Sequence, residues 1–294
     1  MRILIYGAGV IGSLYATLFS KAGFDVTIYA RGNRLIQLQN NGLKYLFHNQ
    51  VKTARVEIID NLKPNDKYQY IFLTVREEQV KVALSELRNN KSPNIVTMVN
   101  SIEPYIEWEK ICGKGRILPA FPGAGGSIED GVLDASLTPW MIQPTTFGEI
   151  NGNKTKREMI LAQIFRKSHI PYQIVSDMHN WQVSHLGMVV PIADAYYMSD
   201  MPVMVYKEKD IMDITAKRMK HNFKSLFKMG RLSNFKFKLF MIGPTWLLSF
   251  VVKNIFKSDF GNKFMYRHSM KSAKEMRDMH NKFYAYMKES TKLS

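Results

Sequence analysis

The sequence predicts a mixed α/β fold in which a doubly wound parallel sheet is followed by an all-α domain. Strand, glycine turn, helix and strand follow one another within residues 2–32. Two short apolar runs, at 70–75 and 94–99, are typical of parallel strands that are buried on both faces. The C-terminal part instead repeats its apolar residues at helical spacing. We therefore expect an α/β domain over residues 1–175 and a helical domain over residues 176–294.

The glycines after the first strand, Gly7, Gly9 and Gly12, have the spacing Gly-x-Gly-x-x-Gly. In a dinucleotide-binding fold the first permits a tight turn, the second lets a pyrophosphate approach the backbone, and the third lets the helix pack against the strand. The pyrophosphate then lies at the helix N-terminus, where unpaired N–H groups and the helix dipole favour an anion. The alternative is a glycine-rich turn without a ligand. Because a strand precedes and a helix follows, we expect a Rossmann-type site formed by Gly7, Ala8, Gly9, Val10, Ile11 and Gly12.

The end of the second strand, residues 26–30, indicates which dinucleotide binds. An NAD-binding fold places Asp or Glu there to bond the ribose 2′-hydroxyl, whereas this chain continues with Arg31 and, three residues later, Arg34. The planar guanidinium of Arg31 can bind a 2′-phosphate with two hydrogen bonds, so we expect NADP(H). The alternative is that Arg31 is a solvated loop residue.

The other elements of the first domain follow from hydrophobic periodicity. The expected strands are 43–47, 51–59, 70–75, 94–99 and 172–175, and the expected helices are 77–89 and 154–169. Beyond Arg116 the pattern changes to short strands and turns. A second glycine-rich loop, residues 122–127, either brings backbone close to a ligand or simply makes a turn.

Two polar residues stand near the carboxyl ends of expected parallel strands. Arg76 follows the strand 70–75, and Asn100 follows the strand 94–99. Ligands of open α/β sheets bind at this edge. Both residues are therefore candidates for contact with the cofactor.

Composition excludes several classes of protein. With 294 residues, 46% hydrophobic and 22% charged, the chain is long enough for two domains with cores and does not resemble a disordered protein. The single cysteine, Cys112, excludes an internal disulfide framework and fits a reducing compartment. Met1 directly precedes the first strand, so we expect no signal peptide and a cytoplasmic location. We also expect no metal site.

The net charge of +16 is concentrated in residues 201–294, which hold 20 lysines and arginines against 7 aspartates and glutamates. Such a surface is either simply solvated or attracts anionic lipid or nucleic acid. We expect no nucleic-acid partner and consider contact with an anionic membrane surface. The apolar stretch 239–252 is too short to span a bilayer alone and is interrupted by Gly243-Pro244. It forms either a pair of core helices or an interfacial segment.

The first domain resembles the ketopantoate reductase (2-dehydropantoate 2-reductase) family, which uses NADPH to reduce a 2-keto acid. The resemblance rests on ILIYGAGVIGSLYATLFSKAGFDVTIYARG, on LTVREEQV and on VTMVNS. It implies that the three glycines and Arg31 bind the dinucleotide. It also implies that Arg76 stands where the family usually has a cofactor-contacting lysine, and that Asn100 lies beside the nicotinamide ribose.

The second domain departs from the family pattern. The family's helix reads Trp-x-Lys-Leu, then two spaced asparagines and a proline, and its lysine acts as the general acid. Here the helix runs from Trp181 to Pro191; alignment on either end places Val183 or Gln182 at the lysine position, and both asparagines are missing. Two residues near the C-terminus resemble the family's substrate-binding serine and glutamate, with altered spacing: Ser269 and Glu275.

Reduction of a carbonyl requires a hydride donor at the carbon and a proton donor at the oxygen. His185 lies near the same helical turn as the missing lysine, and its usual pKa suits proton transfer, although such a histidine is more often structural. We expect His185 and Asn100 to be catalytic in an NADPH-dependent oxidoreductase that acts on a 2-keto acid or related carbonyl other than ketopantoate. A homodimer is the assembly that we consider. The other hypothesis is a non-catalytic NADP(H)-binding or sensor protein, with or without membrane-surface attachment.

Overall fold

The structure, a computed structural model, describes residues 1–271 and 273–292. The chain divides into two compact units, Met1–Met178 and His179–Ser294. Each unit has its own hydrophobic core.

The central sheet of the first unit contains β1 (Arg2–Tyr6), β2 (Asp25–Tyr29), β5 (Glu57–Ile59), β6 (Tyr70–Leu73), β7 (Ile95–Met98), β8 (Ile117–Phe121), β11 (Thr145–Phe147) and β12 (Tyr172–Ile174). The strand order is β12-β11-β8-β7-β6-β1-β2-β5. Neighbouring strands from β5 to β8 are parallel, and only β11 runs antiparallel to its neighbour β8. The six parallel strands, in the order β5-β2-β1-β6-β7-β8, thus have the 3-2-1-4-5-6 order of a doubly wound dinucleotide-binding fold. This order confirms the expected fold class.

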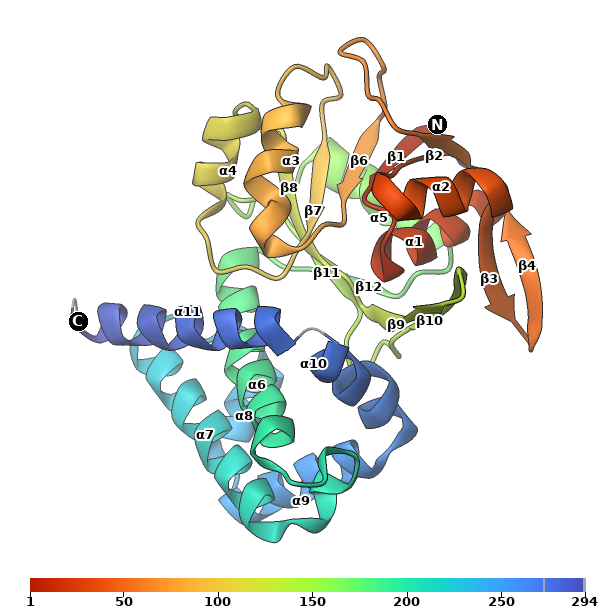
Figure 1. Ribbon diagram of the computed structural model, residues 1–294. Coiled ribbons are helices and arrows are strands. Elements are labelled where there is room, and N and C mark those ends of the chain that lie inside the picture. Colours follow the sequence, from red (N-terminus) through yellow and green to blue (C-terminus); the bar gives the residue numbers. More distant parts are fainter. Residues whose placement is uncertain (272, 293–294) are drawn as a thin grey trace. The chain divides into compact units, whose positions relative to one another are not determined.

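Helices cover both faces of this sheet (Figure 1): α1 (Val10–Lys21), α2 (Gly32–Asn41), α3 (Val80–Leu87), α4 (Tyr105–Cys112) and α5 (Lys156–Lys167). On one face, Phe19 of α1 and Phe165 of α5 share a core cluster with Phe72 of β6. Helices α3 and α4 lie on the other face, where Leu84 and Trp108 are buried. This arrangement leaves the carboxyl ends of β1, β2 and β6 at one edge of the sheet.

A smaller sheet consists of β3 (Leu43–Phe47), β4 (Gln50–Ala54), β9 (Ala124–Glu129) and β10 (Val132–Leu137), in the order β4-β3-β10-β9. It corrects the expectation of one strand over 51–59. The first part of that run, β4, pairs with β3, whereas β5 joins the central sheet beside β2. Periodicity cannot show such a change of partner, because both halves remain extended. The expected helix 77–89 also divides, into a 3₁₀ turn Glu77–Gln79 and α3.

The second glycine-rich loop has a structural explanation. A Cβ at Gly123 would lie 2.4 Å from the carbonyl oxygen of Gln143, and one at Gly126 would lie 2.2 Å from that of Asp134. Gly126 also has φ +154°. These glycines let strands approach closely. Residues 124–127 lie in β9, so most of the expected loop is strand and its glycines serve the packing of the sheet.

The described part of the second unit is helical, as expected (Figure 1): α6 (Met178–Met198), α7 (Lys209–Lys228), α8 (Phe235–Ile242), α9 (Thr245–Lys257), α10 (Arg267–Lys271) and α11 (Ala273–Lys292), with a 3₁₀ segment Pro202–Lys207 and a π segment Gly261–Tyr266. Its core includes Phe223 of α7 and Tyr196 of α6, whose ring lies 4.8 Å from that of Phe256 on α9. Pro191 lies within α6. None of the described helices is long and apolar enough to cross a bilayer.

The turn from β1 into α1 allows no side chain at two of its glycines. A Cβ at Gly12 would lie 2.0 Å from the carbonyl oxygen of Gly7 and 2.5 Å from Oγ1 of Thr74. Gly7 itself has φ +111°, in the region that favours glycine. At Gly9, by contrast, no heavy atom lies within 4 Å of the Cβ position. Two of the glycines therefore serve the fold, whereas Gly9 faces open space.

We expect Gly12→Ala to lower the free energy of unfolding by about 1–3 kcal/mol, the usual cost of forcing extra carbon into a packed site. Urea unfolding followed by circular dichroism measures the change. Gly9→Ala is the matched control and should cost less than about 1 kcal/mol, because its methyl group meets no atom. Equal losses in the two variants would contradict this account of the turn.

Candidate functional site

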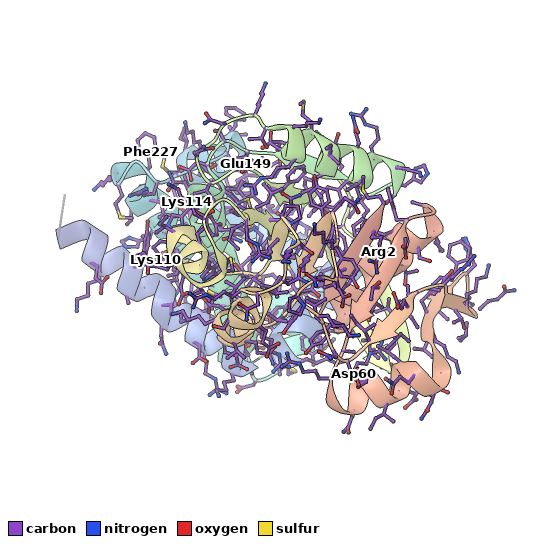
Figure 2. The ribbon with its side chains drawn as sticks, turned by 90° about the horizontal axis from the view of Figure 1, so that it is seen from above. Arg2, Asp60, Lys110, Lys114, Glu149 and Phe227 are labelled. Atoms are coloured by element: carbon purple, nitrogen blue, oxygen red, sulfur yellow. The ribbon has the colours of Figure 1, made fainter. Side chains whose placement is uncertain are left out.

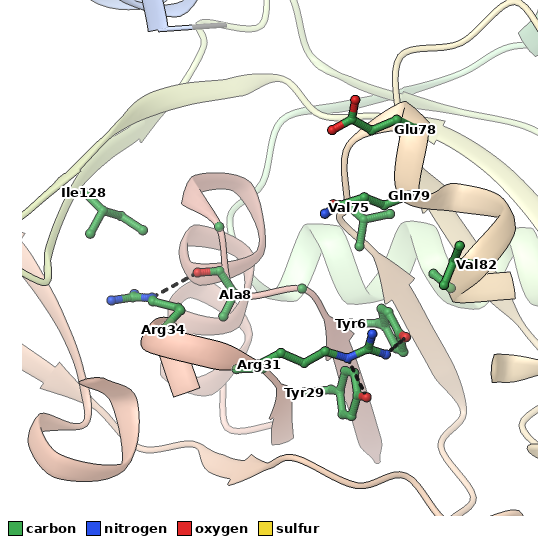
Figure 3. A pocket seen from close by; sticks show the side chains of 14 residues that line it. Tyr6, Ala8, Tyr29, Arg31, Arg34, Val75, Glu78, Gln79, Val82 and Ile128 are labelled. Carbon is green, nitrogen blue, oxygen red and sulfur yellow. Dashed lines mark hydrogen bonds between the residues drawn. The ribbon is translucent and has the colours of Figure 1, made fainter. Parts of the chain in front are cut away.

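A pocket of about 600 Å³ opens at the carboxyl ends of β1, β2 and β6, where the strand order reverses. Ligands of doubly wound folds bind at this topological switch point. Figure 3 shows the pocket from close by. Its lining residues are Tyr6, Gly7, Ala8, Gly9, Tyr29, Ala30, Arg31, Arg34, Val75, Glu78, Gln79, Val82, Ala83 and Ile128.

The floor of the pocket is the glycine turn and the start of α1. The N–H groups of the first turn of a helix have no partner within the helix, and the first turn of α1 contains no acidic residue. Thr74, just beyond β6, donates from Oγ1 to the carbonyl oxygen of Gly7 at 2.8 Å and fixes the turn. With open space above Gly9, backbone donors here can approach an anionic group directly.

Arg34 flanks the same turn. Its Nε donates to the carbonyl oxygen of Ala8 at 3.1 Å, and its Nη2 donates to Oγ of Ser13 at 3.2 Å. A third bond joins Nη1 to Oε1 of Gln37 at 2.5 Å. The guanidinium therefore holds a fixed position beside the phosphate-sized space over α1.

Arg31 lies at the opposite side of the pocket, at the end of β2. Its Nε donates to the hydroxyl of Tyr29 at 2.8 Å and its Nη2 to that of Tyr6 at 2.7 Å (Figure 3). The two tyrosines are register partners on β1 and β2, and their rings stack 4.6 Å apart. This pair of rings supports the guanidinium where the sequence places a cofactor-selecting residue.

A carboxylate that the spacing of residues did not predict also reaches Arg31. Glu86 of α3 forms an ion pair with Arg31 and accepts a hydrogen bond from the hydroxyl of Tyr6. Burial, followed by the hydrogen bond to Glu86, raises the pKa of Tyr6, so its hydroxyl remains protonated at neutral pH. A 2′-phosphate at Arg31 would have to compete with Glu86 for the guanidinium, and the two anions would repel each other.

Arg76 and Asn100 lie at the same edge of the sheet as the pocket, beyond β6 and β7. The side chain of Arg76 is exposed, and Arg76 is not among the pocket-lining residues. Asn100 is half-buried, and its Oδ1 is buried without a hydrogen-bond partner among the residues that the structure describes. Since a buried acceptor rarely stays unpaired, Asn100 fits contact with a bound group.

His185 belongs to the second unit, on α6. It is buried, and its ring stacks on that of Trp181 with centroids 5.2 Å apart. Burial lowers the pKa of His185 to about 4. The imidazole is therefore neutral at pH 7. Gln182 and Val183, the alternative residues for the family's lysine position, are buried as well. None of the three offers a ready proton to an alkoxide.

The two C-terminal candidates lie on different helices of the second unit. Ser269 of α10 is buried, and its carbonyl oxygen accepts a hydrogen bond from the hydroxyl of Tyr197 at 2.6 Å. Glu275 lies in the first turn of α11 and is half-buried. Their substrate-binding role stays a prediction.

Several pocket residues were missed by the sequence reasoning. Tyr6 and Tyr29 end β1 and β2, so their place at the strand ends was an available signal. Gln79 and Ile128 come from later segments, and Glu86 lies 55 residues beyond Arg31 along the chain. No local spacing connects these residues to the glycine turn.

The combined set of an open helix N-terminus, two arginines and an unpaired asparagine oxygen fits a dinucleotide.

Comparison with known sequences points in the same direction. The family model "Ketopantoate reductase PanE/ApbA" matches residues 3–151. Two curated relatives are each named 2-dehydropantoate 2-reductase. The protein from Archaeoglobus fulgidus is 25% identical over 60% of this chain and 57% of its own length, and the one from Mesorhizobium japonicum is 29% identical over 61% of each. The chain thus spans about three fifths of the length of the curated relatives it matches.

Solved structures share the fold over almost the whole chain. The 2-dehydropantoate 2-reductase of Geobacter metallireducens GS-15 superposes with a TM-score of 0.67, at 15% identity and covering 100% of both chains. A D-mandelate dehydrogenase, solved with NADH and anilino(oxo)acetate, superposes with a TM-score of 0.62, at 13% identity and covering 99% of both chains. At these identities the likeness shows the fold alone.

The family match covers the glycine turn, Arg31, Glu86 and Asn100, and it extends over just over half of the chain. The chain belongs to the ketopantoate reductase family.

Proposed function

We propose that this protein is an oxidoreductase that binds NADP(H) in the first unit and reduces the carbonyl of a 2-keto acid other than ketopantoate. The observation that carries the proposal is the pocket over Gly9, where the N-terminus of α1 lies open between Arg31 and Arg34. A pyrophosphate and a ribose phosphate would there meet backbone donors and two cations.

When bound, NADPH supplies the hydride, which forms a C–H bond at the carbonyl carbon while a proton is taken up at the oxygen. The chain's part is to hold the dinucleotide and to supply that proton or an equivalent charge. Asn100, with its unpaired Oδ1, is suited to orient the ribose next to the nicotinamide. His185 of α6 could donate the proton only after a conformational change exposes its ring, because burial keeps the imidazole neutral at pH 7.

The proposal excludes ketopantoate because the second unit lacks the family's lysine and asparagines on α6. The names of the curated relatives refer to 2-dehydropantoate, but their match covers only part of their length. In this chain either Val183 or Gln182 takes the lysine position, depending on the alignment, and both are buried. A different keto acid or related carbonyl therefore fits this helix better.

One observation favours a second candidate, a protein that binds NADP(H) without turnover. The pKa of His185 is lowered to about 4 by burial, so about one imidazole in a thousand is protonated at pH 7. Such a residue is a poor acid unless a conformational change exposes it. Binding of the dinucleotide without oxidation would support this second candidate.

The experiment that separates the two candidates supplies NADPH and a panel of 2-keto acids and follows absorbance of the reduced cofactor. We expect oxidation with at least one keto acid, and a rate with ketopantoate well below the best rate. Tight NADPH binding with no oxidation across the panel would refute the enzyme and retain the sensor.

Gly9→Ala should weaken NADPH binding roughly tenfold or more while the protein stays folded, because its methyl group points into the open pocket.

Cofactor choice is tested at Arg31 and Glu86. We expect NADPH to bind well over tenfold more tightly than NADH, and Arg31→Ala to remove most of that difference, because a charge-assisted contact contributes about 1.5–3 kcal/mol. Glu86→Gln keeps the size of the side chain but removes the competing charge, so it should strengthen NADPH binding and leave NADH little changed. Fluorescence titration measures the six affinities, those of the unaltered protein and the two variants for NADPH and for NADH. Equal affinity of the unaltered protein for the two cofactors would contradict the NADP(H) assignment.

The environment of His185 predicts a pH dependence of stability. Its folded pKa of about 4 lies below the unfolded value of 6.5, so the unfolded state binds the proton first as pH falls. Stability should therefore decrease between pH 6.5 and pH 4 by up to about 3 kcal/mol from this residue. His185→Gln should lose less over the same range, as measured by urea unfolding at each pH. Identical pH profiles would show that His185 is not buried in its neutral form.

The same variant addresses the proton donor. If His185 donates the proton, His185→Gln should lower turnover roughly a hundredfold or more and leave NADPH affinity unchanged. Unchanged turnover would exclude His185 as the acid.

A further inference from the structure

Helices α8 and α9 carry large apolar side chains that the core does not use. Phe235, Leu239 and Ile242 recur at helical spacing on α8 and are 71%, 51% and 74% exposed. Trp246, Leu247 and Phe250 form a similar stripe on α9, and Trp246 is 70% exposed. We call these six residues the α8–α9 face. Exposed apolar residues are common singly, but a contiguous group of this kind marks a contact surface.

The opposite sides of both helices pack against the same helix, α7. The ring of Phe237 on α8 lies 5.3 Å from that of Phe223 on α7. On α9, Ser249 donates from Oγ to Oδ1 of Asp213 at 2.6 Å, and Leu248 is buried. Most of the α8–α9 face therefore points away from α7 and is exposed, whereas Ile242 at the end of α8 borders α7.

The break between the two helices is also held by α7. Lys220 donates from Nζ to the carbonyl oxygen of Gly243 at 2.5 Å, immediately before Pro244. The two short helices thus follow one another along the surface of the unit.

The segment that carries this face is strongly basic. Residues 214–258 contain ten lysines and arginines and no aspartate or glutamate. A groove of about 330 Å³ between α7 and α8 brings basic and apolar side chains together. It is lined by Lys220, Lys224, Phe227, Lys228, Met241 and Ile242. Phe227, labelled in Figure 2, lies on α7 and is 52% exposed.

We propose that the α8–α9 face, with the lysines around it, docks on the surface of an anionic lipid bilayer. The apolar side chains would enter the boundary between headgroups and acyl chains, and the lysines would reach the headgroup phosphates with their flexible stems. A tryptophan such as Trp246 favours this boundary, because one part of its ring is apolar and its N–H is polar.

Two features favour a bilayer over other anionic partners. A nucleic acid would pair with the lysines but would leave most of the six apolar side chains without a suitable partner. An acidic protein would need its own apolar patch to match them. A lipid surface provides both a sheet of negative charge and an apolar interior, and stable attachment generally takes both signals.

The experiment is cosedimentation of the full chain with vesicles of phosphatidylcholine alone and of phosphatidylcholine mixed with phosphatidylserine in equal amounts. We expect binding to the mixed vesicles only, and weaker binding as salt rises through the physiological range, where the Debye length is about 8 Å. Trp246→Ser should weaken binding roughly tenfold or more. Trp140→Ser is its matched control, because Trp140 is 62% exposed in the first unit, and it should leave binding unchanged.

The charge component has its own control. Replacing exposed Lys224 and Lys228 by Gln together should weaken binding, whereas Gln at exposed Lys67 and Lys91, which removes the same charge from the first unit, should have a smaller effect. Equal binding to both kinds of vesicle, or none at low salt, would overturn the proposal. So would a dimer that Trp246→Ser dissociates, since a second copy would then cover the face. Far-ultraviolet circular dichroism, measured for each variant, reports that the helical second unit remains folded.

Discussion

The structure depends on one close approach, that of α1 to the end of β1. At Gly12 there is room only for hydrogen, because the carbonyl oxygen of Gly7 and the hydroxyl of Thr74 occupy the space where a side chain would begin. This contact brings the first turn of α1 directly over the carboxyl ends of β1 and β6. The anion-binding end of the helix and the strand ends therefore form one pocket, and Thr74 couples the two by its bond to Gly7.

The Arg31 side of that pocket is governed by a balance of charges. Arg31 is shared among two tyrosine hydroxyls and the carboxylate of Glu86. The guanidinium is preorganised by this set, which lowers the entropy lost on binding a phosphate, but Glu86 is a competing anion. Cofactor preference then depends on the difference between the attraction of a phosphate to Arg31 and its repulsion by Glu86. The presence of an arginine alone does not fix it.

The sequence predicted what depends on local chemistry. The glycine spacing, the basic residue after β2 and the helical periodicity beyond Asp177 are each visible within a short window, and the fold agrees with them. It did not predict the division of 51–59 between two sheets, because the partner of an extended segment is decided by distant residues. Glu86 was missed for the same reason. The burial of His185 agrees with the structural alternative that its apolar helix face allowed.

The carboxylate-free segment 214–258 also bears on the second unit by itself. Ten cations with no intervening acid repel one another across a small surface, and this repulsion opposes the compact state. Dissolved salt screens that repulsion, as any polyanion that gathers around the lysines would. The second unit should thus gain conformational stability from the same ionic strength that weakens its attraction to other charged bodies, so its folding and its associations respond to salt in opposite directions.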